Sequence, residues 1–149
     1  MERPRSRCPI NLAVELVGDS WSLLVLRDVM FADRHGFGEL HAGSLEGIAT
    51  NILTDRLRRL VDAGLLTREP VPGHRQRVRY QLTEAAMDLY PVLLAMASFS
   101  LRHLDPDPDL ASWAREVHAG GPEREEDVLA QIRRSNGLAH VPSAGQVVP

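Results

Sequence analysis

Apolar residues recur along the first third of the chain with the spacing of helices. The segment 9–18 opens with a proline suited to a first helical turn and closes with a glycine suited to a stop. The segment 21–31 carries apolar side chains around most of a helix, which is typical of a buried central helix that Asp19 or Ser20 can cap. A short third helix is expected over 37–42.

The segment 48–63 predicts an amphipathic helix, because its apolar residues share one side at about 100° per residue. Gly64 suits the position just past the end of this helix. The apolar residues are Ile48, Ile52, Leu53, Leu57, Leu60 and Val61. The opposite side carries Asn51, Thr54, Asp55, Arg58 and Asp62. A polar face of this kind is most often a solvated surface, so its role depends on what surrounds it.

Two strand-like segments joined by a turn follow and predict a β-hairpin over 66–82. Strand alternation would place Arg75, Arg77 and Arg79 on one side of this hairpin. The next segment, 84–104, is apolar on nearly every side, with a proline inside it that predicts a kink. A small core cannot cover so much apolar surface, so a second subunit is the expected cover.

This order of four helices, two strands and a long helix is the order of a winged helix-turn-helix. The predicted fold class is mainly α with a small β-hairpin, in which a C-terminal dimerisation helix and a short helical extension complete the winged helix-turn-helix. The net charge is −3, yet residues 48–80 sum to +4 and residues 103–149 to −4. All 17 basic residues are arginines, and the guanidinium group of arginine can bind phosphate through two hydrogen bonds. The positive charge of the helix and the hairpin therefore favours binding to nucleic acid.

The composition fits one ordinary globular domain with appendages. The 149 residues are 44% hydrophobic and 25% charged, which is usual for a soluble protein. No apolar run of about 18 residues and no signal peptide is expected, so we predict a cytoplasmic protein with no membrane partner. A single cysteine, Cys8, fits a reducing compartment.

Four stretches together resemble the HxlR-type winged-helix transcriptional regulators. They are CPINLAVELVGDSWSLLVLRDVMF, FGEL, GIATNILTDRLRRLVDAGLLTRE and VRYQLTEAAMDLYPVLLAM, in that order. The resemblance implies a bacterial, homodimeric, DNA-binding repressor or activator that is not an enzyme. The expected organisation is a flexible arm (1–7), a DNA-binding and dimerisation domain (8–104), a helical extension (105–135) and a flexible tail (136–149).

Candidate DNA contacts follow from the polar side of the helix and from the hairpin. Base edges are the expected partners of Thr50, Asn51, Thr54 and Arg58. Phosphates are the expected partners of Ser44, Arg56, Arg59, Arg75 and Arg77. The expected partner is double-stranded DNA carrying an inverted repeat.

The sequence also contains a candidate for signal sensing and leaves two alternative functions open. Cys8 precedes a helix, where the dipole favours the reactive thiolate, and several HxlR-type regulators sense oxidants through a cysteine at this place, so Cys8 is a redox-sensing candidate. One alternative is a small-molecule sensor with its ligand between the long helix and the extension 109–134. Another is a winged-helix module whose basic face binds an acidic protein.

Catalytic, metal and cofactor sites are not expected. His35, Glu39 and His41 match no zinc-binding spacing. Gly36 and Gly38 lack the further glycine and the strand of a dinucleotide fingerprint. No grouping of nucleophile, base and acid emerges from the sequence order, so an enzyme is the weakest class.

Overall fold

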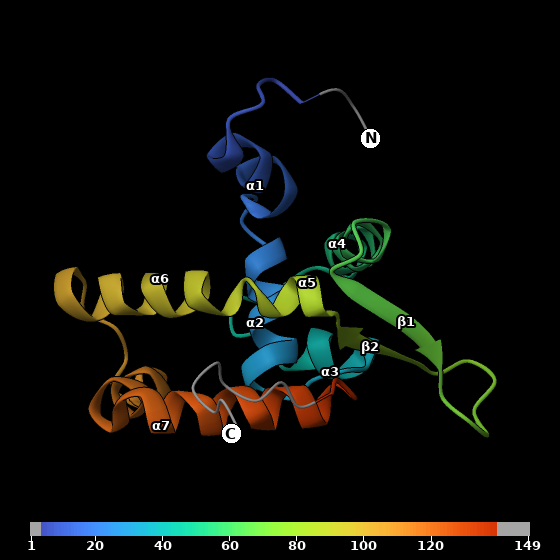
Figure 1. Ribbon diagram of the computed structural model, residues 1–149. Helices are drawn as coiled ribbons and strands as arrows, with labels where there is room; N and C mark the ends of the chain where they lie inside the picture. The colour runs from blue at the N-terminus through green and yellow to red at the C-terminus, as the bar shows by residue number, and fades with distance from the viewer. Residues whose placement is uncertain (1–3, 140–149) are drawn as a thin grey trace, which may run out of the picture. The chain divides into compact units, whose positions relative to one another are not determined.

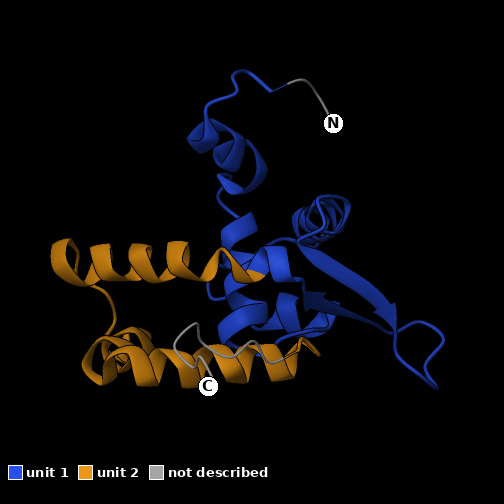
Figure 2. Cartoon of the chain, viewed as in Figure 1, with its two compact units in different colours: residues 1–86 blue, residues 87–149 orange. Residues whose placement is uncertain are grey.

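The computed structural model describes residues 4–139. The chain divides into two compact units, residues 1–86 and residues 87–149 (Figure 2). The predicted arm and tail fall in part on residues 1–3 and 140–149, which lie outside the described residues. The domain boundaries expected from the sequence stay a prediction.

The first unit has the predicted succession of helices and a hairpin (Figure 1). Its elements are α1 (Pro9–Val17), α2 (Ser22–Phe31), α3 (Phe37–Ala42), α4 (Thr50–Asp62), β1 (Leu66–Pro70) and β2 (Val78–Leu82). The short helix α5 (Glu84–Met87) leads out of this unit. The mainly α fold with a small β-hairpin is therefore confirmed.

The end of α4 shows how the sequence specifies a helix stop. Gly64 adopts a φ of 71°, a left-handed conformation that glycine reaches without steric cost. In that conformation the Gly64 N–H donates to the Val61 carbonyl and the Leu65 N–H donates to the Leu60 carbonyl, both over 2.9 Å. These bonds satisfy carbonyls that a helix end leaves unpaired, and they confirm the predicted role of Gly64.

The hairpin is antiparallel, with Leu66 opposite Leu82. Its second strand begins later than the alternation argument assumed. The Val71 N–H donates to the Arg77 carbonyl over 2.9 Å, which closes a turn over residues 71–77, here called the wing turn. Arg75 and Arg77 therefore lie in the wing turn and not in β2, so the prediction that strand alternation aligns them with a third arginine was wrong.

The core of the first unit lies where α2, α4 and the hairpin meet. The most enclosed side chains there are at most 2% exposed, and they are Leu26, Val29, Leu53, Leu57, Leu60, Leu66 and Leu82. Truncating one of these leucines to alanine typically costs about 2–5 kcal/mol. The core therefore fixes which side of α4 faces inward.

The second unit contains α6 (Tyr90–His103) and α7 (Ser112–Ser135). Pro91 lies in the first turn of α6, where its missing N–H has no helical partner to lose, so the expected kink is a break between two helices. Within α7, Gly121 has a φ of 63° and a ψ of −155°, and Pro122 follows it. This break separates two helical segments within the predicted helical extension.

The apolar stretch Glu84–His103 is longer than the sequence expectation allowed. It spans 20 residues, and its best window has a mean hydropathy of 1.2. Helices α1 and α2 are long and apolar enough to cross a membrane only if they are counted together, and the angle between them is 78°. Core helices of soluble proteins have the same length and composition, so these stretches are weak evidence for a membrane span.

Candidate nucleic-acid interface

Helix α4 turns leucines inward and a polar face outward. Leu53, Leu57 and Leu60 are at most 1% exposed. The exposed residues of the helix are Thr50, Asn51, Thr54, Arg58, Arg59 and Asp62. All four residues predicted to contact bases therefore lie together on the exposed side of one helix.

The short polar side chains of this face are ready to make contacts. The Thr54 hydroxyl donates to the Thr50 carbonyl over 2.8 Å, so the hydroxyl proton is occupied within the helix. The Thr54 oxygen and methyl group remain for an outside partner. Among residues 4–139, the Asn51 amide has no hydrogen-bond partner, and Asn51 is exposed. A free amide can offer a donor and an acceptor side by side to an adenine edge.

Arg56 is engaged inside the protein. Its side chain is 17% exposed, and its Nε lies 3.0 Å from Oδ1 of Asp19, which precedes α2. This contact is an ion pair without the alignment of a hydrogen bond. The Arg56 Nη1 also donates to Oδ2 of Asp55 over 3.3 Å. These contacts support a role for Arg56 in holding α4 against the start of α2, and its phosphate contact stays a prediction.

Arg58 is exposed but also paired. Its Nη2 donates to Oδ1 of Asp55 over 2.5 Å, one helical turn away. Asp55 thus bridges Arg58 and Arg56, and Asp19 completes a line of charges that we call the ion-pair chain: Asp19, Arg56, Asp55 and Arg58. The guanidinium of Arg58 consequently has a preferred direction before any partner binds.

Asp19 anchors this chain and caps α2 at the same time. Its Oδ1 accepts the N–H groups of Trp21 and Ser22 over 2.9 and 3.1 Å, and its Oδ2 accepts the Ser22 hydroxyl. Burial raises the pKa of Asp19, but these hydrogen bonds and the charge of Arg56 together hold it below the usual value. Asp19 is therefore ionised at neutral pH, and the predicted capping role is confirmed.

The loop between α3 and α4 is fixed at two points. Arg27 donates two hydrogen bonds to the Glu46 carboxylate over 2.6 and 2.9 Å, a bidentate pair that lowers the pKa of Glu46 and raises that of Arg27. The half-buried Ser44 accepts the Ile48 N–H on its Oγ over 3.1 Å. Ser44 therefore closes the loop that leads into α4, and its phosphate contact stays a prediction.

The wing turn presents its arginines differently from α4. Arg75 and Arg77 are exposed, and neither has an ion-pair partner among residues 4–139. Arg59, in the last turn of α4, is also exposed. These three predicted phosphate contacts are therefore unencumbered positive charges. Two further arginines of the hairpin, Arg68 in β1 and Arg79 in β2, are also exposed.

His35 anchors the hairpin. His35 is 2% exposed, with its ring Nδ1 2.8 Å from the Tyr80 carbonyl and Nε2 2.7 Å from Asp33. The Tyr80 N–H donates back to the His35 carbonyl over 2.8 Å, so β2 is tied to the turn before α3. The backbone N–H groups of Gly36 and His35 each donate to Glu39 over 2.9 Å and lower its pKa. In the described part of the chain, no three His, Cys, Asp or Glu side chains lie close enough together to hold a metal ion.

Cys8 lies apart from this face, at the N-terminus of α1. It is an exposed free cysteine in the capping position, and its side chain makes no capping hydrogen bond. Its carbonyl accepts the Leu12 N–H over 3.0 Å, which closes the first turn of the helix. The thiol is therefore accessible to a reagent in solution.

Several site residues escaped the sequence analysis. Asp55 was recognised only as part of the polar side, and the Arg27 and Glu46 pair was not recognised. The Arg27–Glu46 and Arg56–Asp19 pairs join different segments and leave no periodic signal. The i,i+3 spacing of Asp55 and Arg58 within α4, by contrast, was a signal that could have been used. The GDSW motif around Asp19 was the other available hint, because it was already part of the family resemblance.

The helices α2, α3 and α4 followed by the hairpin, with an exposed polar face on α4, define the winged helix-turn-helix class of transcriptional regulators. Within this class, residues 16–108 match the family described as HxlR-like helix-turn-helix. The match covers well over half of the chain, so the chain belongs to the HxlR-like family. The family and its named relatives are transcriptional regulators and not enzymes.

Individual proteins agree with this assignment. An uncharacterized HTH-type transcriptional regulator of Mycobacterium tuberculosis is 40% identical over 100 residues, which span 67% of this chain and 61% of that protein. The crystal structure of PA1607, a candidate transcription factor, aligns with a TM-score of 0.63 at 25% identity over 100% of this chain and 84% of the other. The redox regulator HypR in its oxidized form aligns with a TM-score of 0.56 at 28% identity over 66% of this chain and 100% of the other.

Proposed function

We propose that this protein is a cytoplasmic repressor that binds an inverted-repeat DNA operator as a homodimer. The observation that carries the proposal is the exposed polar face of α4 beside a wing turn with two unpaired arginines. A protein that only needed solubility would not require a free amide and oriented guanidinium on one helix and unpaired arginines on the next element. This pairing is what base reading and phosphate binding need.

The proposed contacts divide between α4 and the wing turn. In the major groove, the Asn51 amide would pair with an adenine edge and the Arg58 guanidinium with a guanine edge. Thr50 and Thr54 would complete the base contacts. Phosphates would be held by Ser44, Arg59, Arg75 and Arg77. Arg56 would act indirectly, by keeping α4 in place.

The direct test is a mobility-shift titration of the chain with the DNA upstream of its own gene. We expect a saturable shift that unrelated DNA of equal length does not compete away. A reporter on the same DNA should rise when the gene is deleted, because a bound repressor blocks transcription. The rival protein-interaction module takes precedence if operator and unrelated DNA bind equally weakly.

The proposed homodimer rests on apolar surface left exposed in each unit. In the first unit, α1 exposes Ile10, Val14 and two leucines, with Ile10 at 74%. In the second unit, Val92, Met96 and Phe99 line an open groove on α6, each more than 40% exposed. Soluble monomers rarely leave such patches uncovered. Light scattering at micromolar concentration should give about twice the chain mass, and a monomer that binds the operator tightly would disprove the dimer.

Cys8 is the proposed redox-responsive residue of this regulator. Its exposure supports this role, as does the likeness to a structure described as a redox regulator in oxidized form. Peroxide or a quinone should weaken operator binding by the native chain and leave Cys8→Ser unchanged. Because each chain has one cysteine, a disulfide product must be intersubunit or mixed, and the other products are a sulfenic acid formed by peroxide or an adduct formed by the quinone. Equal responses of the two proteins would remove Cys8 from the mechanism.

A further inference from the structure

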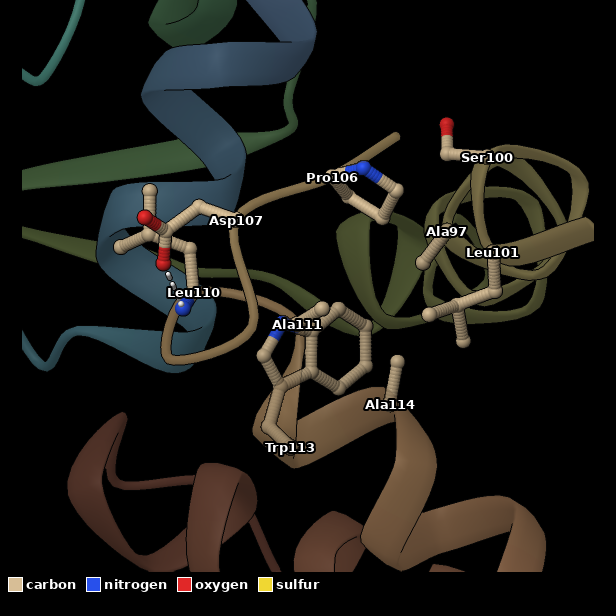
Figure 3. A pocket seen from close by; sticks show the side chains of 9 residues that line it. All are labelled: Ala97, Ser100, Leu101, Pro106, Asp107, Leu110, Ala111, Trp113 and Ala114. Atoms are coloured by element: carbon tan, nitrogen blue, oxygen red, sulfur yellow. Dashed lines mark hydrogen bonds between the residues drawn. The ribbon is translucent and has the colours of Figure 1, made fainter. Parts of the chain in front are cut away.

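The second unit holds a half-open cavity between α6, the loop that follows it and the start of α7 (Figure 3). Its volume is about 200 Å³. Ala97 and Leu101 of α6 form one wall, and Trp113 and Ala114 of α7 form another. Figure 3 shows the Trp113 indole projecting between the loop and the α6 residues. The cavity therefore combines a flat aromatic surface with aliphatic walls.

Polar groups at the rim are already satisfied within the protein. The Ser100 hydroxyl donates to the Met96 carbonyl over 3.1 Å. One carboxylate oxygen of Asp107 accepts the N–H groups of Asp109 and Leu110 over 2.9 and 3.1 Å, which holds the loop in its turn. The cavity wall thus persists without a ligand, and apolar contact is the main attraction it offers.

The loop at the cavity carries a concentrated negative charge. Asp105, Asp107 and Asp109 occur within five residues, and Asp107 lines the cavity itself. Arg115 is the basic residue that reaches this loop, where its Nη1 donates to the Pro108 carbonyl over 3.1 Å. A negatively charged ligand would be repelled at the rim, whereas an amine would be attracted by it.

We infer that this cavity binds a small uncharged or cationic aromatic molecule that acts as an effector of the regulator. An apolar cavity of about 150 Å³ suffices for benzene, so 200 Å³ accommodates one ring with a short substituent. The family match ends at residue 108, whereas Trp113 and Ala114 lie in the extension beyond it. The cavity is thus formed jointly by α6, which lies within the family match, and by the extension beyond it, and its effector role rests on the proposed DNA-binding function.

Three probes with the same ring and different charge test the chemical class. Benzylamine, benzyl alcohol and benzoate are titrated into the full DNA-free chain and followed by ligand-observed NMR. We expect saturable millimolar binding of the amine and the alcohol, with benzoate about tenfold weaker because of the aspartates. Equal binding of all three probes, or no saturable binding of any, would overturn the inference.

Variants locate the binding and test the role of charge. Ala97→Leu fills the cavity and should reduce benzylamine binding about tenfold, whereas Ala119→Leu, on an exposed part of α7, should not. Asp107→Asn keeps an oxygen for the loop N–H groups while removing the charge. Asp107→Asn should therefore reduce the difference in binding affinity between benzylamine and benzoate. Circular dichroism and thermal unfolding verify that each variant is folded.

The effector role has its own readout. Saturating benzylamine should change the affinity of the native chain for its operator by at least about threefold and leave Ala97→Leu unaffected. Binding without any change in operator affinity would overturn the effector role. Probe binding is measured without DNA, so a chain that binds no operator would contradict the proposed function and still decide whether the cavity is a ligand site. If Ala97→Leu instead abolishes self-association and no probe binds, the cavity is covered by a second copy and the inference fails.

Discussion

Two arginines of α4, Arg56 and Arg58, carry the same charge as the arginines of the wing turn but lie in different surroundings. Arg56 and Arg58 belong to the ion-pair chain, where carboxylates fix the directions of their guanidinium groups. Arg75 and Arg77 are exposed and lack such partners in the described part of the chain. A fixed guanidinium suits discrimination between bases, whereas an unpaired one contributes charge wherever phosphate lies. In the proposed DNA complex, this contrast would assign the positive charges of the region to two different tasks.

The largest expected effect comes from removing the reading groups of α4. Asn51→Ala and Arg58→Ala should each weaken operator binding by about 1–3 kcal/mol and affect unrelated DNA much less. Each group would contact base edges, which only the operator presents in the right order. Paired titrations on operator and unrelated DNA in one buffer measure the contrast. If both variants retain the operator preference while folded, α4 does not read the operator.

Arg56→Ala separates the anchoring task from the binding task. It should lower the free energy of unfolding by about 1–2 kcal/mol, because Asp19 is left partly buried without its cation. Urea denaturation measures this, with Arg59→Ala as the control because Arg59 is exposed. If Arg56→Ala leaves the stability unchanged and reduces the salt dependence of DNA binding, Arg56 contacts phosphate directly.

Asp55→Asn removes the negative charge that distinguishes the surroundings of Arg58 from those of the wing-turn arginines. Without the carboxylate, Arg58 should lose its preferred direction and resemble the arginines of the wing turn. We expect tighter binding to unrelated DNA and a loss of operator preference of about 1 kcal/mol. Competition titrations check the preference. An unchanged preference would mean that the Asp55 pair does not orient Arg58 on DNA.

The contribution of the wing turn should appear in the salt dependence of DNA binding. Arg75→Ala and Arg77→Ala should each lower the slope of log affinity against log salt by about one, on operator and unrelated DNA alike. Asp62→Asn is a control, since removing an exposed negative charge on α4 should tighten binding slightly or leave it unchanged. A loss confined to the operator would instead give the wing turn a part in base reading.

Acid should produce the smallest effect, through the loop before α4. The pKa of Glu46 is lowered in the folded state, chiefly by its hydrogen bonds from Arg27. Its stabilisation is therefore complete above the ordinary value of 4.5 and is lost as the pH falls through the lower folded value. Glu46→Gln should flatten the acid limb of the stability curve slightly, and Glu123→Gln should not. Identical curves for the two variants would show that this pair contributes nothing measurable.

The sequence predicted those features that depend on neighbours along the chain. The amphipathic helix that became α4, its stop at Gly64 and the β-hairpin all follow from local spacing and turn chemistry. The expectation that strand alternation extends to Arg75 was wrong, because Arg75 lies in the wing turn that the hydrogen bond between Val71 and Arg77 closes and β2 begins only at Val78.

Contacts between distant segments were beyond the sequence analysis. The assignment of Arg56 to phosphate could not anticipate Asp19, because nothing in the spacing brings these two residues together. One alternative function placed a ligand between the long helix and the extension 109–134, which is where the cavity lies, but the residues that line it were not predicted. Its lining depends on how the loop at Asp107 returns the chain and places Trp113, which composition does not specify.

The glycine stop at Gly64 joins α4 to β1 almost directly, since the helix ends at Asp62 and the strand begins at Leu66. A connection this short leaves the helix and the wing little freedom to move apart. In evolutionary terms, the outward residues of α4 can then change one at a time while the distance from the read bases to the wing turn stays constant. Operators of the descendants of such a protein would drift in base sequence and keep their spacing.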